Sequence, residues 1–590
     1  MSTETIAPIF VPNFKETSFK EFHRLRPKRE IYTEDGYRWA IFEEEKTGLT
    51  LVGLEDLETH ITFWTPLANP NKRTAAYKAW GGARQSRAPG TPPEIYMEMG
   101  EKGVDPDKKV EQTFIGYGHK SVGDMARMMR DADGVPIHYP FAEFNDEYTN
   151  AGQEKSSRYI RKFRSMVLFE IKHFLQKDKI SKEDLGEIEG RYQAIGKLSQ
   201  ELAQKHKSSL AKAFSEHFEP KNSRERDSLG SRVLDCTRFF TLLGQRTAMS
   251  NDNSAREWSR TISDLRASPI RFYQRMGEHL QRFFTPTRDE EDLLGFKAEA
   301  PSLIRHTEPT TTTNDNIKAL HSYLEVETDL KDVVEIDYSE KVEAEGQGVE
   351  LLDRKYTEGD KMVAQYVMTI WPGMKRQQVL DWVHSRPDEI KSKISSIIMN
   401  GHHCNNELSL LAITRGITLV HDCSIGEARD DNRHRGFGRF IPLPILFGEK
   451  LNLDTVAQIL AKGFVLPAYL THMPELRDIK TEFESDLKTL YEEIYGFIKF
   501  MHQTHDGVLE DYSFVLNLLP MAHKTELWMH GDPKQVFYMP DRRRRPGGHV
   551  NYILLAQEAN KLVRESDPYL SGMKFPAPNP FSRDEFFNRS

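Results

Sequence analysis

Apolar and polar positions follow two different patterns along the chain. In the first ~80 residues, short aromatic and β-branched runs interrupt polar, irregular sequence, as in 37–42 (YRWAIF) and 59–64 (THITFW). Such runs are typical of strands, and we expect them to form a leader packed onto the domain that follows. Further on, 155–176 and 186–214 predict long helices. In the second of these, apolar residues recur at spacings of three and four, which indicates an amphipathic surface helix.

The composition changes in the segment 296–346, which is rich in Pro, Thr and acidic residues. This change predicts an inter-domain linker with some local structure. We expect the linker to bury little and to carry no chemistry. The chain then divides into an N-terminal extension (1–75), a first domain (76–295), the linker and a second domain (347–590).

The composition also limits the class of protein. Hydrophobic residues make up 38% and charged residues 29% of the 590 residues, which is enough apolar mass for folded cores and excludes wholesale disorder. The formal net charge of -8 disfavours duplex nucleic acid as the main partner. Three cysteines without a Cys-x-x-Cys pair exclude a disulfide scaffold and favour a reducing compartment. Cys236 and Cys423 are expected in the core.

Two further patterns bear on localisation. The N-terminal residues lack a basic region followed by an apolar one, so they do not resemble a signal peptide. No stretch approaches the ~18 consecutive apolar residues of a membrane span. We therefore expect a cytoplasmic protein with no membrane contact.

An internal repeat is the most informative feature of the sequence. Three landmarks occur twice in the same order, at offsets of 283, 278 and 277 residues: Gly118-His119 with Gly401-His402, Leu243 with Met521, and Arg266 with Arg543. Ordered landmarks with a nearly constant offset indicate two diverged copies of one domain.

A further set of motifs is divided between the two copies. The first copy carries Glu154, Ser156, Ser157, Arg158 and Tyr159, and the second carries Arg433-His434-Arg435, Leu519-Pro520, Arg543 and Gly548-His549. Together with the repeated landmarks, these motifs resemble the flavin-dependent thymidylate synthases in their tandem, duplicated form. The resemblance covers about residues 75–290 and 347–575.

The resemblance implies a fold and a reaction. The fold would be α/β (α+β), a duplicated domain with a mixed sheet and long helices. FAD, reduced by NADPH, would take a one-carbon unit from methylenetetrahydrofolate and pass it to C5 of dUMP. Two tandem chains would form a homodimer.

The resemblance also implies a composite site, because family members build each active site from more than one subunit. The second copy would supply the cofactor-binding residues His402, Glu407, Arg433, His434 and Arg435, with Arg433 and Arg543 as catalytic residues and Arg543 at the pyrimidine. The first copy would supply Glu154, Ser156, Ser157 and Arg158 to the nucleotide. Arginine suits such ligands because its planar fork can hold phosphate or carbonyl oxygens in two bonds.

Several departures from the family pattern leave the substrate open. The family's phosphate-binding arginine falls at Ala248 and Glu526, a family glutamine falls at Asp430, and Leu443 replaces a serine. Asp430 could accept from an exocyclic amine such as that of cytosine, or could be a surface acid. The alternatives are therefore a repurposed homologue that acts on another pyrimidine or metabolite, and a catalytically silent nucleotide-binding scaffold. Without the repeat, residues 433–435 would suit a solvated charge cluster and 542–545 a basic helix end.

Overall fold

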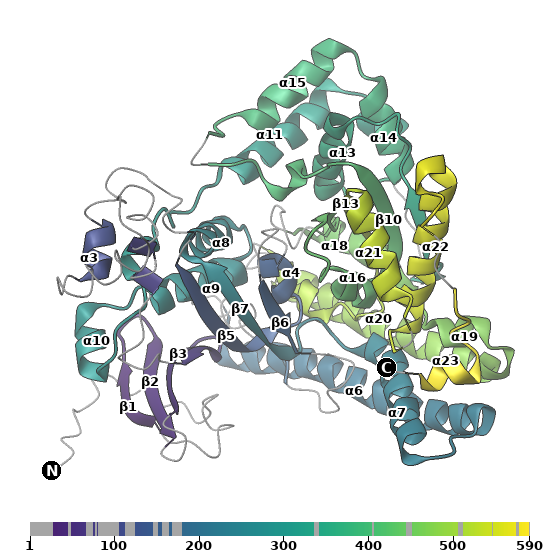
Figure 1. Cartoon of the computed structure of the whole chain (residues 1–590), viewed down its shortest axis with the longest axis horizontal. Coiled ribbons are helices and arrows are strands. Elements are labelled where there is room, and N and C mark those ends of the chain that lie inside the picture. Colours follow the sequence, from purple (N-terminus) through teal and green to yellow (C-terminus); the bar gives the residue numbers. More distant parts are fainter. Residues whose placement is uncertain are drawn as a thin grey trace. The chain divides into compact units, whose positions relative to one another are not determined.

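The chain forms two compact units in a computed structural model (Figure 1). The first comprises residues 1–135, 149–155 and 246–310, and the second comprises 136–148, 156–245 and 311–590. The repeat boundaries given above stay a prediction, because compact units group elements by packing and not by descent. The structure describes residues 27–44, 49–66, 75–76, 79–80, 105–111, 124, 126–144, 151–155, 165–167, 180–335, 342–403, 406–443, 451–505, 511–545, 547–573 and 577–588.

The first unit is built on a seven-stranded sheet in the order β1-β2-β3-β4-β5-β7-β6. The two runs predicted as strands near the N-terminus form β2 and β4, and β4 pairs with β5, so this region joins the sheet directly. The strands are β1 (Pro27–Tyr32), β2 (Tyr37–Glu44), β3 (Leu49–Asp56), β4 (Ile61–Pro66), β5 (Arg127–Pro136), β6 (Ala151–Glu154) and β7 (Arg246–Ser254).

Helices complete the first unit. They are α3 (Pro106–Val110), α8 (Ala255–Ala267), α9 (Arg271–Phe284) and α10 (Arg288–Leu294). Helix α9 packs its aromatic face on the sheet, where Phe283 stacks on Trp39 at 6.3 Å and His279 Nε2 lies 3.0 Å from the backbone O of Leu54. Burial of these rings supplies much of the unit's apolar core.

The second unit has a four-stranded sheet in the order β11-β13-β10-β9. Strand β10 (Ile417–Ser424) pairs antiparallel with β13 (Lys524–Gly531) along its whole length, from Ile417 opposite Gly531 to Ser424 opposite Lys524. The outer strands are β9 (Gly348–Leu351) and β11 (Gly438–Phe440), and β8 (Ala344–Glu345) pairs with β12 (Phe464–Val465). The β8–β12 pair is parallel, but most of the described strand pairs are antiparallel, and together with the many helices they place the chain in the expected α+β class.

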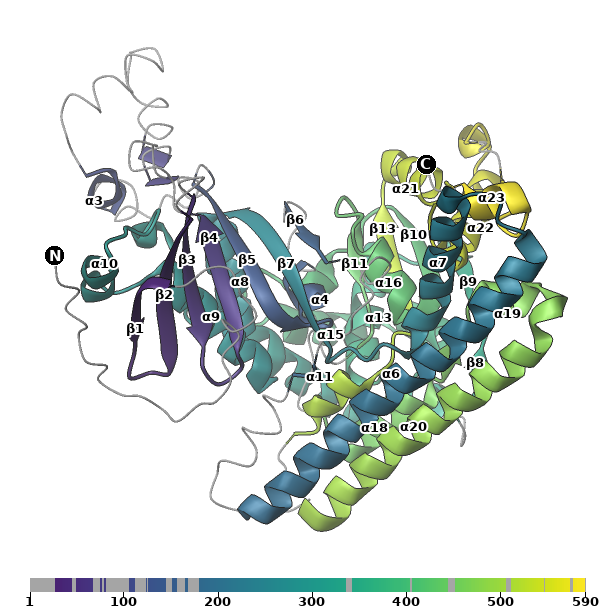
Figure 2. The same cartoon turned by 90° about the horizontal axis from the view of Figure 1, so that it is seen from below.

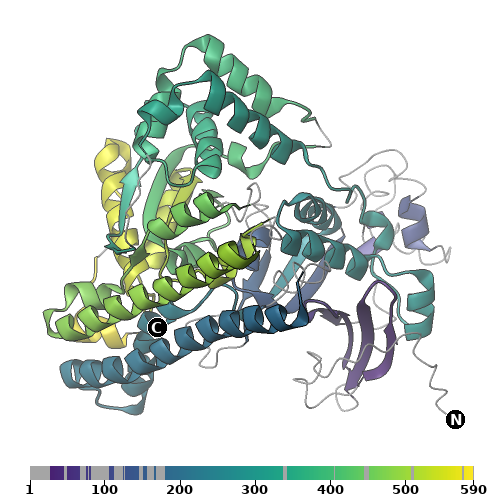
Figure 3. The same ribbon diagram turned by 180° about the vertical axis from the view of Figure 1, so that it is seen from behind.

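Two long helices lie side by side in the second unit (Figures 2 and 3). Helix α6 (Lys182–Phe218) is the amphipathic helix that the sequence predicts, and α20 (Arg477–His505) covers its apolar face. Lys205 Nζ and His206 Nε2 of α6 each lie 2.7 Å from Asp486 Oδ2 of α20. The second unit also contains α4 (Tyr139–Phe144), α7 (Ser223–Thr237), α18 (Leu453–Ala461), α19 (Ala468–His472), α22 (Val550–Ser566) and α23 (Arg583–Phe587).

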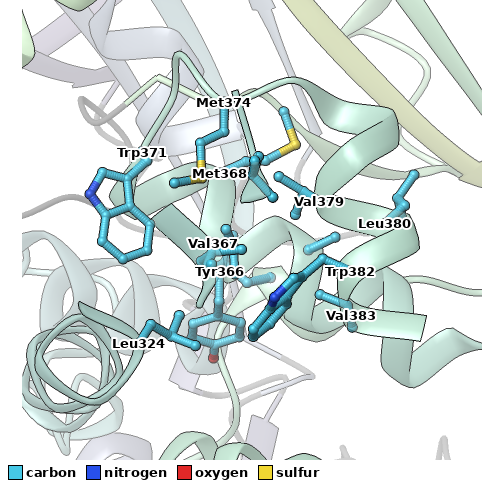
Figure 4. Close-up of a cluster of buried hydrophobic side chains, with 14 of the residues drawn as sticks. Leu324, Tyr366, Val367, Met368, Trp371, Met374, Val379, Leu380, Trp382 and Val383 are labelled. Carbon is cyan, nitrogen blue, oxygen red and sulfur yellow. The ribbon is translucent and has the colours of Figure 1, made fainter. Parts of the chain in front are cut away.

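A helical cluster forms the remaining part of this unit, and it corrects the expectation that the segment 296–346 buries little. The cluster contains α11 (Thr312–Glu327), α12 (Leu330–Val333), α13 (Glu358–Ile370), α14 (Arg376–Ser385) and α15 (Asp388–Met399). Leu324 of α11 packs with Tyr366, Trp371 and Trp382 in its core (Figure 4). Ile317, Leu320 and Leu324 are at most 1% exposed. The expectation of little burial was wrong because these apolar residues share one helix face despite the polar average.

The helix predicted over 155–176 also needs correction. Of that segment only 155 and 165–167 belong to the described residues, and Ser165–Val167 is not helical. Met166 forms an antiparallel bridge with Gln245, and Val167 N donates to Gly244 O at 2.9 Å. Pairing with a distant segment therefore overrides the helical pattern at this point.

The same order of elements occurs twice along the chain. The first sheet contains the order β5-β7-β6, and the second contains β10-β13-β11. Strand β7 leads into α8 through a capping box of Ser254 and Glu257, and β13 leads into α21 (Pro533–Arg543) through a capping box of Asp532 and Gln535. The second capping box lies 278 positions after the first, because Asp532 follows Ser254 and Gln535 follows Glu257 by that number of residues.

Within the second unit, the segment 239–244 binds the segment 517–522, which lies 278 positions further along the chain. Leu243 N donates to Leu519 O at 2.9 Å, and Met521 N donates to Thr241 O at 2.8 Å. Adding 278 to the residue number of the first donor gives the second donor, and subtracting 278 from the residue number of the first acceptor gives the second acceptor. The same operation relates the bond from Gly244 N to Asn517 O, at 2.8 Å, to that from Ala522 N to Phe239 O, at 3.0 Å. These hydrogen bonds therefore have a two-fold pattern.

Candidate functional site

A short helix after β10 carries the acidic half of the candidate site. Ser424, the last residue of β10, caps α16 (Ile425–Asp431), and Glu427 completes the capping box. A Ser-x-x-Glu sequence satisfies two free N–H groups at a helix start, which explains why the strand turns into a helix here. All seven residues of α16 are buried.

The Arg433-His434-Arg435 motif lies in the turn between α16 and β11. His434 N donates to Asp431 O at 3.0 Å, and Phe437 N donates to His434 O at 3.1 Å, which closes the turn. Gln535 Nε2 of α21 donates to Gly436 O, so the turn is also attached to α21. Figure 1 shows α16 and α21 beside β10 and β13.

Arg543, the last residue of α21, meets this turn. Its Nε donates to His434 Nε2 at 2.6 Å and lies 3.2 Å from Asp431 Oδ1, while its Nη2 donates to Asp430 O. The guanidinium also lies 5.1 Å from the centre of the Tyr552 ring, within the range of a cation–π contact. The structure thus brings together two residues that the sequence places 109 positions apart.

Three carboxyl groups lie buried beneath the turn, each beside a basic side chain. Glu427 is 0%, Asp430 3% and Asp431 2% exposed. Their basic neighbours are Arg238, whose Nη1 lies 2.9 Å from Asp430 and whose Nη2 lies 3.5 Å from Glu427, and His421, whose Nδ1 lies 3.2 Å from Asp431. Buried carboxyl groups need such partners, because an unpaired charge away from water costs several kcal/mol.

The surroundings shift the pKa values of these groups in different directions. Burial raises the pKa of Glu427 to about 7, although Arg238 and Ser424 act in the opposite direction. Burial also acts to raise the pKa of Asp431, but the hydrogen bond from His421 and the charge of Arg543 outweigh it and hold the pKa below its usual value. Asp431 is therefore ionised at neutral pH.

His434 is neutral in this arrangement. Burial lowers its pKa to about 3, and the positive charge of Arg543 acts in the same direction. Since Nε2 accepts the hydrogen bond from Arg543, the ring proton is on Nδ1. His434 can therefore present an N–H donor to a ligand.

The other two residues of the motif differ in exposure. The side chain of Arg433 is 42% exposed and lies 3.8 Å from Asp430. Arg435 is partly buried, and its guanidinium lies 4.5 Å from the centre of the Phe144 ring. The interpretation of residues 433–435 as a solvated charge cluster thus applies to Arg433 alone.

His402 and Glu407 lie in a separate local turn. His402 Nδ1 donates to Asn406 O at 3.1 Å, and Asn406 Nδ2 donates to Thr312 Oγ1 at 2.8 Å. Glu407 is exposed. The described hydrogen bonds of His402 therefore connect it to the helical cluster and not to Arg543.

The segment that the resemblance assigns to the nucleotide is described only in part. Glu154 ends β6 in the first unit, opposite Met249 of β7. Ser156, Ser157 and Arg158 lie outside the described residues, as do Gly118-His119 and Cys404. Their assignment to the nucleotide stays a prediction.

The structure explains three of the departures from the family pattern. Asp430 is buried against Arg238, so the surface-acid interpretation is wrong. Glu526 lies 2.9 Å from Arg376, which also contacts Glu350 and Asp422, so this position holds an ion-pair network. Leu443 is a buried core residue, and Ala248 lies in β7.

Sequence reasoning missed several residues around Arg543: Arg238, His421, Glu427, Asp431 and, as a site residue, His549. The Ser-x-x-Glu spacing of residues 424–427 could have placed Glu427 at a helix start. Arg238 is 192 positions from Asp430, and no local pattern indicates that contact. Cys236 and Cys423 are buried, as predicted.

The sequence matches no protein-family model, and no curated protein matches it significantly. Among the described residues, no group of three or more His, Cys, Asp or Glu side chains could hold a metal ion. Within the same part of the chain, no helix has the length and apolar character needed to span a membrane.

Proposed function

We propose that this chain is a flavin-dependent enzyme that transfers a one-carbon unit from methylenetetrahydrofolate to a pyrimidine nucleotide, with dUMP as the acceptor and NADPH as the reductant. The observation that carries this proposal is the contact of Arg543 with His434, beside the exposed Arg433. These are the residues to which the resemblance assigns flavin and pyrimidine binding. We further propose a cytoplasmic homodimer of tandem chains.

The repeated order of elements supports the duplicated form of this family. Both sheets share a central strand order, and the hydrogen bonds between 239–244 and 517–522 are related by one offset of 278 residues. A duplicated domain that retains a former subunit interface would produce this pattern.

The residues present fit a bound flavin or pyrimidine ring. Arg543 Nη1 has no hydrogen-bond partner among the described residues, and the side chain of Arg433 is 42% exposed. His434 offers a third donor through Nδ1. Guanidinium and imidazole N–H groups suit the carbonyl oxygens of an isoalloxazine or pyrimidine, and they would stabilise negative charge on a reduced ring. When bound, FAD supplies the redox chemistry of the transfer.

Asp430 argues against cytosine as the preferred base. Its carboxylate is 3% exposed and bonded to Arg238 at 2.9 Å, so the acceptor that a cytosine amine would need is already engaged. A homologue acting on another pyrimidine or metabolite stays the alternative enzyme.

The buried ion pairs favour a second candidate, a nucleotide-binding scaffold without catalysis. Asp430 and Asp431 lie beside Arg238 and Arg543, and such a network could maintain the fold with no ligand. Cofactor retention distinguishes the two candidates.

The first experiment is a visible absorption spectrum of the purified protein, repeated after incubation with FAD and gel filtration. A retained flavin band that weakens in Arg433→Ala supports the enzyme. The matched control is Arg545→Ala, because Arg545 is 53% exposed and pairs with Asp541. A protein that retains no flavin after incubation contradicts the proposal and favours the scaffold.

A further inference from the structure

We propose that Asp431, fixed by His421, is a positioning residue that holds Arg543 in the orientation needed to bind ligand. The identity of the ligand rests on the proposed function, whereas the orientation of Arg543 does not. The resemblance assigns a role to neither Asp431 nor His421.

The guanidinium of Arg543 has a fixed plane. Nε faces both His434 Nε2 and Asp431 Oδ1, and Nη2 donates to a backbone O at the end of α16. Two hydrogen-bond acceptors and the Asp431 carboxylate lie on one side of the guanidinium, and Nη1 is the donor without a partner among the described residues. A planar fork anchored on one side presents its free donor in one direction, which reduces the entropy lost when a ligand binds.

Asp431 is the charged group among these three contacts, and it forms an ion pair with Nε rather than a hydrogen bond. It is the last residue of α16 and is 2% exposed, whereas the side chain of Arg543 is 14% exposed. The ion pair therefore lies in a medium that screens charge weakly, and its orientation is firmly held. His434 Nε2 and the backbone O of Asp430 are uncharged acceptors, so they add no attraction between opposite full charges.

His421 fixes the carboxylate from the opposite side. It lies on β10, is 0% exposed, and its Nδ1 lies 3.2 Å from Asp431 Oδ2, while Arg543 contacts Oδ1. The two oxygens of one carboxylate thus connect a sheet residue to a helix-terminal arginine. Such outer partners commonly fix the geometry of a binding group.

The orientation of the Arg543 side chain can be tested without any ligand. Phenylglyoxal modifies accessible arginines, and mass spectrometry measures the rate at each one. We expect Asp431→Asn to raise the modification rate of Arg543 at least ~3-fold and to leave that of Arg544 unchanged. Asp541→Asn is the matched control, because Asp541 pairs with Arg544 and Arg545 on the same helix. An unchanged rate at Arg543 would overturn the inference.

The ligand arm uses dUMP and FAD as probes, with affinities measured by calorimetry. Asp431→Asn should weaken binding ~10-fold in the native background but less than ~2-fold in an Arg543→Lys background, since a residue acting through Arg543 loses its effect with it. Full additivity would contradict the positioning role. If the native protein binds neither probe, the proposed function fails while the modification rates still test the inference.

A second variant covers the case in which Asp431→Asn does not fold, as judged by circular dichroism. His421→Gln keeps a buried polar side chain and removes the imidazole that faces Asp431. It should raise the modification rate of Arg543 in the same direction by a smaller factor. No change in a folded His421→Gln protein would contradict the assigned role of His421.

Discussion

Arg543 donates a hydrogen bond to His434 across 2.6 Å, and this contact joins the end of α21 to the turn that follows α16. It fixes both the tautomer of the imidazole and the plane of the guanidinium. The two residues come from motifs that the sequence analysis assigned to flavin and pyrimidine. Their contact makes the second unit the place where chemistry should be sought.

Replacing Arg543 should affect stability as well as binding. Arg543→Ala leaves the buried carboxylate of Asp431 with His421 as its remaining described partner, so we expect a loss of about 3 kcal/mol in the free energy of unfolding. Urea denaturation monitors this loss. Arg545→Ala should change the value by less than about 0.5 kcal/mol because that arginine is exposed. Equal effects of the two substitutions would show that the Arg543 ion pair contributes no more to the free energy of unfolding than an exposed ion pair does.

The raised pKa of Glu427 predicts a pH-dependent stability. Its pKa is about 7 in the folded protein against 4.5 in the unfolded chain, so the folded state binds the proton more tightly. The contribution is therefore fully present below pH 4.5 and is lost as the pH rises to about 7, by up to about 3 kcal/mol.

Denaturation of the native protein and Glu427→Gln across this pH range checks the prediction. The difference between the two proteins isolates the titration of Glu427 from that of other groups. Glu257→Gln, at the equivalent position of the α8 capping box, measures the loss of a capping carboxylate alone. A native–variant difference that stays constant with pH would contradict the assignment.

The close contact between 239–244 and 517–522 predicts that a larger residue in place of Gly244 destabilises the protein. A Cβ at Gly244 would lie 2.5 Å from Asn517 Cβ and 2.8 Å from Asn517 O, so the two segments would have to separate. Gly244→Ala should lower the midpoint of thermal unfolding by several degrees, corresponding to about 2 kcal/mol or more. Gly230→Ala is the matched control: it lies inside α7, has nothing within 4 Å, and should stabilise by up to about 1 kcal/mol. A neutral Gly244→Ala would contradict the close crossing.

The helical cluster predicts that α11 is part of a core. Leu320→Ala should cost about 2–5 kcal/mol, since Leu320 is 0% exposed. Val326→Ala on the same helix should be almost neutral, because Val326 is 76% exposed. Denaturation curves compare the two variants. Similar small effects would contradict the burial of α11 and support the expectation that the segment 296–346 buries little.

Local patterns predicted those features that local physics determines. The strands β2 and β4 and the amphipathic α6 follow from residue spacing and propensity. The burial of α11 could have been found from the spacing of Ile317, Leu320 and Leu324, but the polar average of the segment hid it.

The site was predictable only as separate motifs. The sequence identifies Arg433-His434-Arg435 and Arg543 as candidates, yet nothing local states that Arg543 meets His434 or that Arg238 bonds to Asp430. Those contacts depend on how β10 and β13 pair and where each following helix ends. Buried ion pairs between distant residues are consequences of tertiary packing, so a single sequence gives little sign of them.

The reciprocal bonds between 239–244 and 517–522 bear on how the chain is made. Backbone groups of the earlier segment find their partners about 278 residues later, a delay of roughly 14 to 56 s at ribosomal rates of about 5–20 residues per second. During that interval the segment has unpaired backbone groups and buried-type side chains such as Phe239 and Leu243 without their final cover. These contacts can therefore form only after residues 517–522 have been synthesised, so the second unit completes its folding late in translation or after it.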